Sequence, residues 1–459
     1  MASITATTRT LKSRLCDSHD PLDGLLDEPL IHELCRAIGH SWRCCFWRPT
    51  IVILTFLRQV LLPQCSCRQT VAFTTAATAR PGDERRPSDD PSAYSQARQR
   101  LPLALLEQLA ARLASDLTQP DRRWCGHRVR VVDGSSVSMP DTPALQEAFP
   151  QPTSQSPGCG FPVARLVAMF CWTSGALLAM VSDSLAIGEL ALFRRLFDHL
   201  EADDVVLADR LFGNYTELAL LERRGVHVVC RVNAARRLDL RCGTRIGKQD
   251  HRLIWTRPRA VPLGLALQDW NALPPTLTVR IVRVQTVCRR GFRKRRIDLV
   301  TTLQDPIAYP PEALAELYRQ RWLVELNLRS LKTTLGMDVL RCQSPTMVRK
   351  EIAMHQIAYN LIRALMVQAA RTHEVDPQRL SFAGTQQRLL AWLPLWMPTT
   401  KPRTPHPWMS YFLAVIAHDV LPDRPDRNEP RAIKRRRKSF PYLVHCRYQA
   451  RNTAWYDKR

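Results

Sequence analysis

Four polar side chains between Pro310 and Gly336 have types and spacings suited to holding a phosphate group or a metal ion. They are Tyr318, Arg321, Glu325 and Lys332. At roughly 100° per residue, a helix would place all four within an arc of about 60° and a length of about 20 Å. The segment therefore predicts one polar ridge with a carboxylate between cations.

Glu325 is the unusual member because apolar residues surround it in the sequence, from Trp322 to Leu328. A carboxylate in such a setting needs a cationic partner, since an unpaired buried charge is costly. One interpretation is an ion-pair ladder with Arg321 and Arg329 at four-residue spacing. The other is a metal-binding glutamate flanked by cations that bind phosphate. Spacing alone leaves both open.

The element that must position these residues is a helix from Pro311 to Gly336. Proline suits the first helical position, Glu312 suits the positive helix end, and Gly336 is a typical stop. An apolar stripe, which predicts packing on a core, consists of Leu314, Leu317, Val324, Leu328, Leu331 and Leu335.

The order Tyr318, Arg321, Glu325, Lys332 resembles the Tyr/Arg/Glu/Lys signature of DDE transposases of insertion sequence family four. The resemblance extends through DGSSVSMPDTP, GCGFPVARLVAMF and the ADR before Leu211. It spans most of 21–446 and is strongest from 128 to 365.

This resemblance implies that Asp133, Asp209 and Glu325 are the catalytic residues and metal ligands. It also implies that Tyr318, Arg321 and Lys332 bind the phosphates of the element ends. The residues themselves say less: Asp133 lies in a strand-like stretch and Asp209 at the end of a buried strand. An aspartate there is more often a cap or turn residue. Asp141 and Asp183 are nearby acidic residues outside the motif, and we expect them to be structural.

Three such carboxylates would hold two Mg²⁺ ions about 3.5–4 Å apart, with Mn²⁺ as a possible substitute. The resemblance implies cleavage at insertion-sequence ends and strand transfer into target DNA. This is a cut-and-paste route with a hairpin intermediate. It also implies a homodimer that bridges two terminal inverted repeats. A catalytically inactive remnant that binds DNA, and a nuclease without strand transfer, are the alternatives.

Composition supports a nucleic-acid partner. The 459 residues carry a formal charge of +24 and a pI near 10.0, which favours a polyanion. No segment is typical of a membrane span, and the N-terminus lacks a secretory pattern. We expect a cytoplasmic, nucleoid-associated protein with reduced cysteines. A zinc site at His40, Cys44, Cys45, Cys65 and Cys67 is disfavoured because the paired finger spacing is absent.

The order of elements predicts an α/β, RNase H-like catalytic core with a β-rich insertion. We expect a helical DNA-binding region at 1–120, the core at 121–345 with the insertion at about 233–296, and a helical region with a basic tail at 346–459. Basic clusters at 289–296 and 434–438 are expected to contact DNA phosphates. Trp255 and Trp270 are candidates for base stacking, although packing is the more common role.

Overall fold

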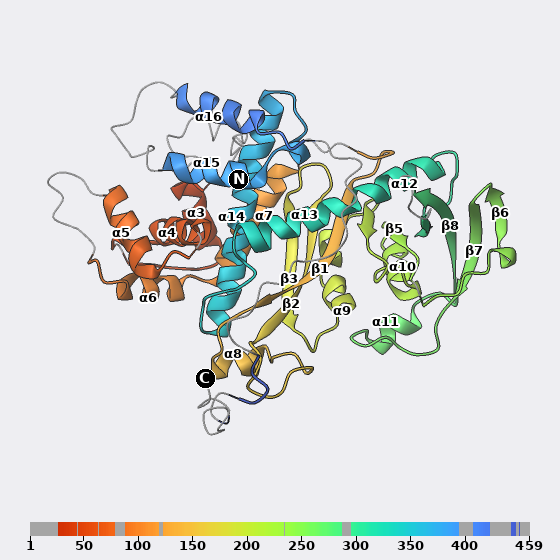
Figure 1. The fold of residues 1–459 in the computed structure, drawn as a ribbon, viewed down its shortest axis with the longest axis horizontal. Helices are drawn as coiled ribbons and strands as arrows, with labels where there is room; N and C mark the ends of the chain where they lie inside the picture. Colours follow the sequence, from red (N-terminus) through yellow and green to blue (C-terminus); the bar gives the residue numbers. More distant parts are fainter. Residues whose placement is uncertain are drawn as a thin grey trace, which may run out of the picture.

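One mixed sheet of nine strands organises the molecule (Figure 1). The computed structural model describes residues 26–43, 45–62, 64–78, 88–118, 123–233, 235–286, 295–393, 407–422, 442–446 and 449. The strand order is β3-β2-β1-β4-β5-β9-β8-β7-β6. The strands are β1 (Val129–Ser138), β2 (Val163–Cys171), β3 (Leu177–Ser184), β4 (Val205–Ala208), β5 (His227–Arg231), β6 (Thr244–Gly247), β7 (Asp250–Thr256), β8 (Thr276–Thr286) and β9 (Arg295–Thr301).

Helices cover both faces of this sheet. The α-helices are α3 (Glu28–Ala37), α4 (Pro49–Leu61), α5 (Cys67–Thr78), α6 (Ser92–Arg100), α7 (Leu103–Leu117), α8 (Pro143–Ala148), α9 (Glu189–Arg194), α10 (Tyr215–Glu222), α11 (Leu267–Asn271), α12 (Pro311–Arg319), α13 (Leu323–Arg329), α14 (Pro345–Thr372), α15 (Phe382–Trp392) and α16 (Pro407–His418). Five short 3₁₀ or π turns, η1 to η5, complete the described elements.

The alternation of side chains along β1 and β4 assigns each residue to one of two cores. Val131 and Leu207 belong to the core shared with α3, α4, α7 and α12–α16. Val132 and Ala208 belong to the opposite core, shared with α9, α10 and α11. Because successive residues of a strand point to opposite faces, Asp133 and Asp209 follow on the α13 face.

The N-terminal helices do not have a core of their own. Buried residues of α3, α4 and α7 belong to the same cluster as β1 and α14. The long α14 packs against α7, α4 and α16, and thereby joins early and late parts of the chain (Figure 1). The same cluster holds buried residues of the helical run that precedes α14, among them Leu314 and Leu328.

The segment predicted to be a β-rich insertion, which contains β6, β7 and β8, extends the sheet. Strand β9 pairs antiparallel with β5, Val229 opposite Thr301, and β8, β7 and β6 follow outward. Trp255 and Trp270 are buried in the second core, so packing is their role here.

An ion pair between Arg280 and Asp250 lies inside the insertion. Both side chains are almost fully buried. Arg280 Nη1 also donates to the backbone oxygen of Tyr309 at 2.9 Å. This links the insertion to Tyr309, two residues before α12.

The helical run that begins at Pro311 has the predicted extent, but the prediction of one uniform helix is wrong. It consists of α12, a 3₁₀ turn η3 (Gln320–Trp322), α13 and a π turn η4 (Ser330–Thr334). Tertiary contacts accompany the change of winding, since Trp172 Nε1 donates to Gln320 Oε1 at 2.7 Å. Gly336, with φ of +75°, ends the run as expected.

Among the residues described, no helix has the length and apolar character needed to cross a membrane. The apolar stretch 51–62 is largely in α4, and the stretch 167–181 makes the hairpin of β2 and β3. A turn at Thr173–Gly175 connects these two strands, with Gly175 at φ +68°.

Candidate active site

The register of two parallel strands aligns Asp133 with Asp209. Val132 of β1 is the partner of Ala208 of β4, so the two aspartates are the next residues along neighbouring strands. Neighbouring strands lie about 4.8 Å apart and both side chains point to the α13 face. Burial of the strand core before Asp209 makes this alignment firm, because a slip of one residue would turn the apolar set outward.

Glu325 reaches the same face from α13, which contacts β1. Arg321 lies one turn earlier and joins the two elements. Its Nη2 donates to Glu325 Oε1 at 2.6 Å, and its Nη1 lies 3.9 Å from Asp133 Oδ2. The ion pair expected at four-residue spacing is thus present with Arg321. Glu325 is 57% exposed, so the expectation that apolar neighbours would bury it is wrong.

The carboxylates act on one another electrostatically. Burial raises the pKa of Asp133 to about 6, and the negative charges of Asp209 and Glu325 act in the same direction. The hydrogen bond from Gly134 N and the Arg321 guanidinium oppose this rise. The single positive charge of Arg321 is therefore smaller than the combined negative charge of the carboxylates around it.

Tyr318 and Lys332 flank this group on the same helical run. Burial raises the pKa of Tyr318 to about 12, and the charge of Asp209 contributes to the rise. Lys332 Nζ donates to Ser135 Oγ of β1 at 3.0 Å and pairs with Asp338 Oδ1 at 3.0 Å. The polar ridge predicted from sequence thus faces β1 beside the aspartates.

Residues 124–361 match the family model described as the transposase DDE domain, which is just over half of the chain. The chain belongs to the DDE transposases. It is 28% identical over 363 residues to the transposase InsG of insertion sequence element IS4 from Escherichia coli K12, which covers 78% of this chain and 79% of that protein. This places it in insertion sequence family four. It is also 33% identical over 88 residues to the transposase of element IS421 from Escherichia coli, which covers 19% of this chain and 21% of that protein.

The sequence analysis missed Glu189, a fourth carboxylate beside the group of Asp133, Asp209 and Glu325. It lies at the start of α9 on the opposite face of the sheet, against Gly134 of β1. Burial raises the pKa of Glu189, and the charges of Asp133 and Asp209 add to this effect. A methyl group at Gly134 would lie 2.2 Å from Glu189 Oε1. The Glu189 carboxylate fits here because Gly134 has no side chain. The local sequence around either residue does not indicate this contact.

Asp141 and Asp183 have structural contacts in the transposase, as expected. Asp141 Oδ1 accepts from Gln146 Nε2 at 2.8 Å, and Asp183 Oδ2 pairs with Arg195 at 2.7 Å. Both carboxylates stabilise local turns and helix ends.

DDE transposases use divalent metal ions. The donor set of this transposase fits such ions, because Asp133, Asp209 and Glu325 offer only oxygen atoms, which hard cations prefer. The raised pKa of Asp133 is a second sign of fit, since a nearby cation would stabilise the crowded negative charge.

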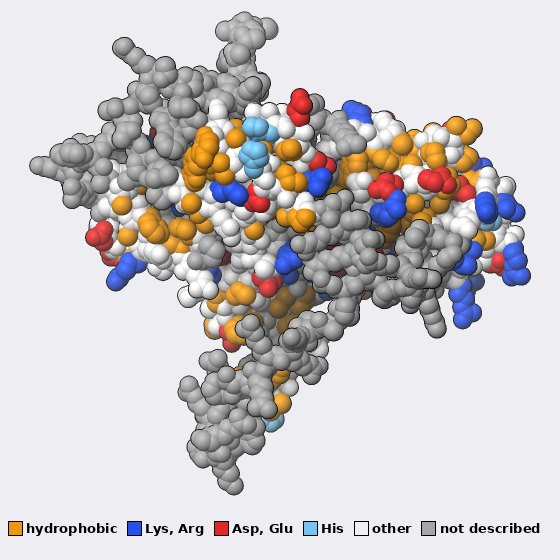
Figure 2. Space-filling view, turned by 45° about the horizontal axis from the view of Figure 1, so that its top comes forward, with side chains coloured by type: hydrophobic (Ala, Val, Ile, Leu, Met, Phe, Trp, Pro, Cys, Tyr) orange, Lys and Arg blue, Asp and Glu red, His pale blue; other side chains and the backbone are white. Residues whose placement is uncertain are grey.

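Exposed cations gather at the outer end of the insertion, beyond the candidate site. Figure 2 shows Lys and Arg side chains at the end of the molecule where β6 and β7 lie. The exposed residues there include Arg237, Arg241, Arg245 and Lys248. Most of the predicted basic cluster at 289–296 and all of the cluster at 434–438 lie outside the described residues.

Proposed function

We propose that this transposase cuts at the ends of an insertion sequence and transfers those ends into target DNA by a cut-and-paste route. The observation that carries the proposal is the alignment of Asp133 with Asp209 opposite Glu325, with Arg321 between them. Asp133, Asp209 and Glu325 are the proposed catalytic residues.

The same three residues are the proposed ligands of two Mg²⁺ ions, for which Mn²⁺ can substitute. When bound, such ions supply the positive charge that activates an attacking oxygen and stabilises a leaving oxygen in phosphodiester cleavage. The role of the chain is to hold the carboxylates in a fixed group, Asp133 and Asp209 on the rigid sheet and Glu325 on the helical run.

Arg321, Lys332 and Tyr318 are the proposed ligands of the phosphates at the element ends. Arginine presents a planar group that can contact two phosphate oxygens, whereas lysine acts as a point charge. The pKa of Tyr318, raised to about 12, keeps its hydroxyl protonated, so it can donate to a phosphate oxygen. These contacts would hold the strand during formation of a hairpin at the element end.

The two reactions use one site. In the first, water attacks the phosphorus and the bond to the 3′ oxygen breaks, which leaves a 3′ hydroxyl on the element and a 5′ phosphate on the flank. In the second, that hydroxyl attacks a phosphodiester, and the 3′ oxygen of the attacked strand leaves as a new 3′ hydroxyl. In the hairpin route the attacked strand is the opposite strand of the same end. Water then opens the hairpin by the first reaction, and the restored 3′ hydroxyl attacks a phosphodiester of the target DNA.

Double-stranded DNA is the proposed partner, both as terminal inverted repeats and as target. The excess of positive charge and the exposed cations near β6 and β7 support contact with phosphates. We also propose that the N-terminal helices take part in DNA binding, and that a homodimer bridges two ends. The transposase would then work in the cytoplasm, associated with the nucleoid.

The test is cleavage of labelled element-end DNA by the purified protein, with and without Mg²⁺. Glu325→Gln is expected to abolish the metal-dependent cut and to retain DNA binding. Glu316→Gln is the matched control, because Glu316 lies on the same run and pairs with the exposed Arg319. Equal cutting by the Glu325→Gln variant would overturn the catalytic assignment.

Analysis of the products separates transposition from simple hydrolysis. Joining of the cut end to an unlabelled plasmid is expected in the presence of Mg²⁺. Products that stop at a free 3′ hydroxyl would indicate a nuclease without strand transfer. DNA binding without a cut by either form would indicate an inactive remnant.

A further inference from the structure

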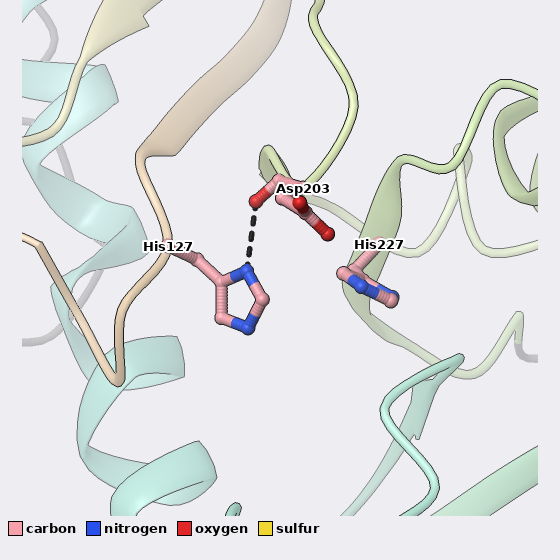
Figure 3. Close-up of side chains that lie close together, drawn as sticks. All are labelled: His127, Asp203 and His227. Carbon is pink, nitrogen blue, oxygen red and sulfur yellow. Dashed lines mark hydrogen bonds between the residues drawn. The ribbon is translucent and has the colours of Figure 1, made fainter.

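A second group of possible metal ligands lies at the opposite ends of the same parallel strands. His127 precedes β1, Asp203 precedes β4, and His227 is the first residue of β5. Because these three strands are neighbours and parallel, their amino ends meet at one edge of the sheet. One ligand atom from each residue lies within 4.8 Å of the other two, and Figure 3 shows the three side chains converging.

Hydrogen bonds hold His127 in a defined orientation. Its Nδ1 lies 2.8 Å from the backbone oxygen of Asp203, and its Nε2 lies 2.7 Å from Tyr309 Oη. A carbonyl partner of this kind commonly fixes the ring and tautomer of a histidine that binds metal through its other nitrogen. An ion at Nε2 would take the place of the Tyr309 hydroxyl. Tyr309 is the residue that Arg280 holds through its backbone oxygen, so the phenol is itself well placed.

The other two side chains are less engaged. Within the described part of the chain, neither the Asp203 carboxylate nor the His227 ring makes a side-chain hydrogen bond. The His227 and His127 rings meet edge to face, with centroids 5.2 Å apart. Asp203 has a left-handed backbone with φ of +66°, a conformation that an aspartate adopts at a cost.

We propose that His127, Asp203 and His227 bind one divalent cation of the zinc class. Two imidazole nitrogens and one carboxylate oxygen suit Zn²⁺ or Co²⁺ better than Mg²⁺, which prefers oxygen alone. Zinc bonds of about 2.0–2.1 Å require ligand atoms about 3.3 Å apart in a tetrahedron, so the three side chains would have to move closer together when the ion binds. This inference does not rest on the proposed catalytic residues.

The bound ion would fasten the starts of β1, β4 and β5 together. The role is structural: the ion would stabilise the edge of the sheet opposite the carboxylates. Such a site is expected to raise the midpoint of thermal unfolding when zinc is present.

The test is titration of the full-length, metal-free protein with ZnCl₂ by calorimetry, in a background that carries Asp133→Asn and Glu325→Gln. This background removes two proposed Mg²⁺ ligands, so a zinc site there is separate from the catalytic group. One zinc per chain is expected, together with visible absorption when Co²⁺ is used instead. Addition of His227→Asn or Asp203→Asn is expected to remove that site and the rise in the thermal midpoint.

Asp203→Asn guards against a folding defect, because asparagine tolerates the left-handed backbone at this position. His199→Asn is the matched control, since His199 is exposed and lies outside the cluster. Zinc binding that survives both His227→Asn and Asp203→Asn would overturn the proposal. Loss of binding in the Asp133→Asn, Glu325→Gln background alone, or an equal loss in His199→Asn, would overturn it as well.

Discussion

Two arginine–carboxylate groups of the transposase, one in the insertion and one at the candidate site, differ in how far the positive and negative charges match. Arg280 and Asp250 form a closed pair within the insertion, with 0% and 2% of their side chains exposed. Arg280 also donates to backbone oxygens of Leu303, Asp305 and Tyr309, so its donors are well used. Arg321, 17% exposed, faces Glu325 at 2.6 Å and Asp133 at 3.9 Å.

The difference separates structural charge from charge available for chemistry. In the insertion, one cation meets one anion and every remaining donor finds a carbonyl, so nothing is left for a ligand. Beside Arg321, the combined negative charge of three carboxylates is larger than the positive charge of the one guanidinium. An excess of this kind favours binding of further cations. Burial is the main cause that raises the pKa of Asp133, and the charges of Asp209 and Glu325 add to it.

The largest effect on stability is expected when the closed pair is broken. Arg280→Met would leave Asp250 buried and unpaired, at a cost of about 3–5 kcal/mol in the free energy of unfolding. Urea denaturation measures this change. The double variant Arg280→Met, Asp250→Leu should recover most of the loss, because it removes both charges. A double variant as unstable as the single one would show that the pair is not self-contained.

A smaller effect, and one on activity, is expected at the open group. Arg321→Lys keeps the charge and loses the planar group that can contact two phosphate oxygens. Loss of one charged hydrogen bond predicts a cleavage rate lower by about 10- to 100-fold with little change in unfolding. Arg319→Lys, at an exposed position on the same run, should cleave at the parent rate. Equal rates for the two variants would argue against phosphate contact by Arg321.

The pH dependence of stability should distinguish the two groups further. The folded-state pKa of Asp133, about 6, lies above its ordinary value of 3.8. The protonated form is thus favoured by folding, and its contribution to stability is lost as pH rises from about 4 through 6. Without metal, Asp133→Asn should gain stability relative to the parent between pH 5 and pH 7. A constant difference over that range would contradict the raised pKa.

The smallest effect is expected from the fourth carboxylate. In Gly134→Ala the new methyl group would collide with Glu189 Oε1 and displace the side chain. We expect cleavage to slow by about tenfold, less than the ~100-fold of a full misplacement of about 1 Å. Gly188→Ala is the control, because a methyl group there meets no atom within 4 Å. A parent-like rate for Gly134→Ala would mean that Glu189 has no role in positioning the site.

Asp133 and Asp209 were assigned by the family resemblance, since an aspartate at a strand or strand end is ordinary by itself. The sequence predicted the extent of the helical run because Gly336 is a local signal that marks the helix end. It did not predict the 3₁₀ turn at Gln320, which depends on a contact with Trp172, nor the π turn at 330–334. Tertiary contacts of this kind produce no periodic pattern in the sequence.

Contacts between strands of the sheet likewise could not be predicted from local sequence patterns. The pairing of Val132 with Ala208 aligns the aspartates, yet nothing in either strand specifies the other's register. Glu189 reaches the site from the opposite face because Gly134 has no side chain. His127, Asp203 and His227 were not singled out either, since three isolated polar residues before three strands are ordinary until the strands are known to be neighbours.

Because Glu325 lies late in the chain, the group of three carboxylates is completed late during synthesis. The ribosome makes β1, β4 and β5 first, and the helical run emerges only after β9, which pairs back with β5. Helix α14 then joins α4 and α7, which were made near the beginning. A nascent chain that ends before α13 carries Asp133 and Asp209 but lacks Glu325. Competence to cut DNA would therefore arise only when synthesis is well past the middle of the chain.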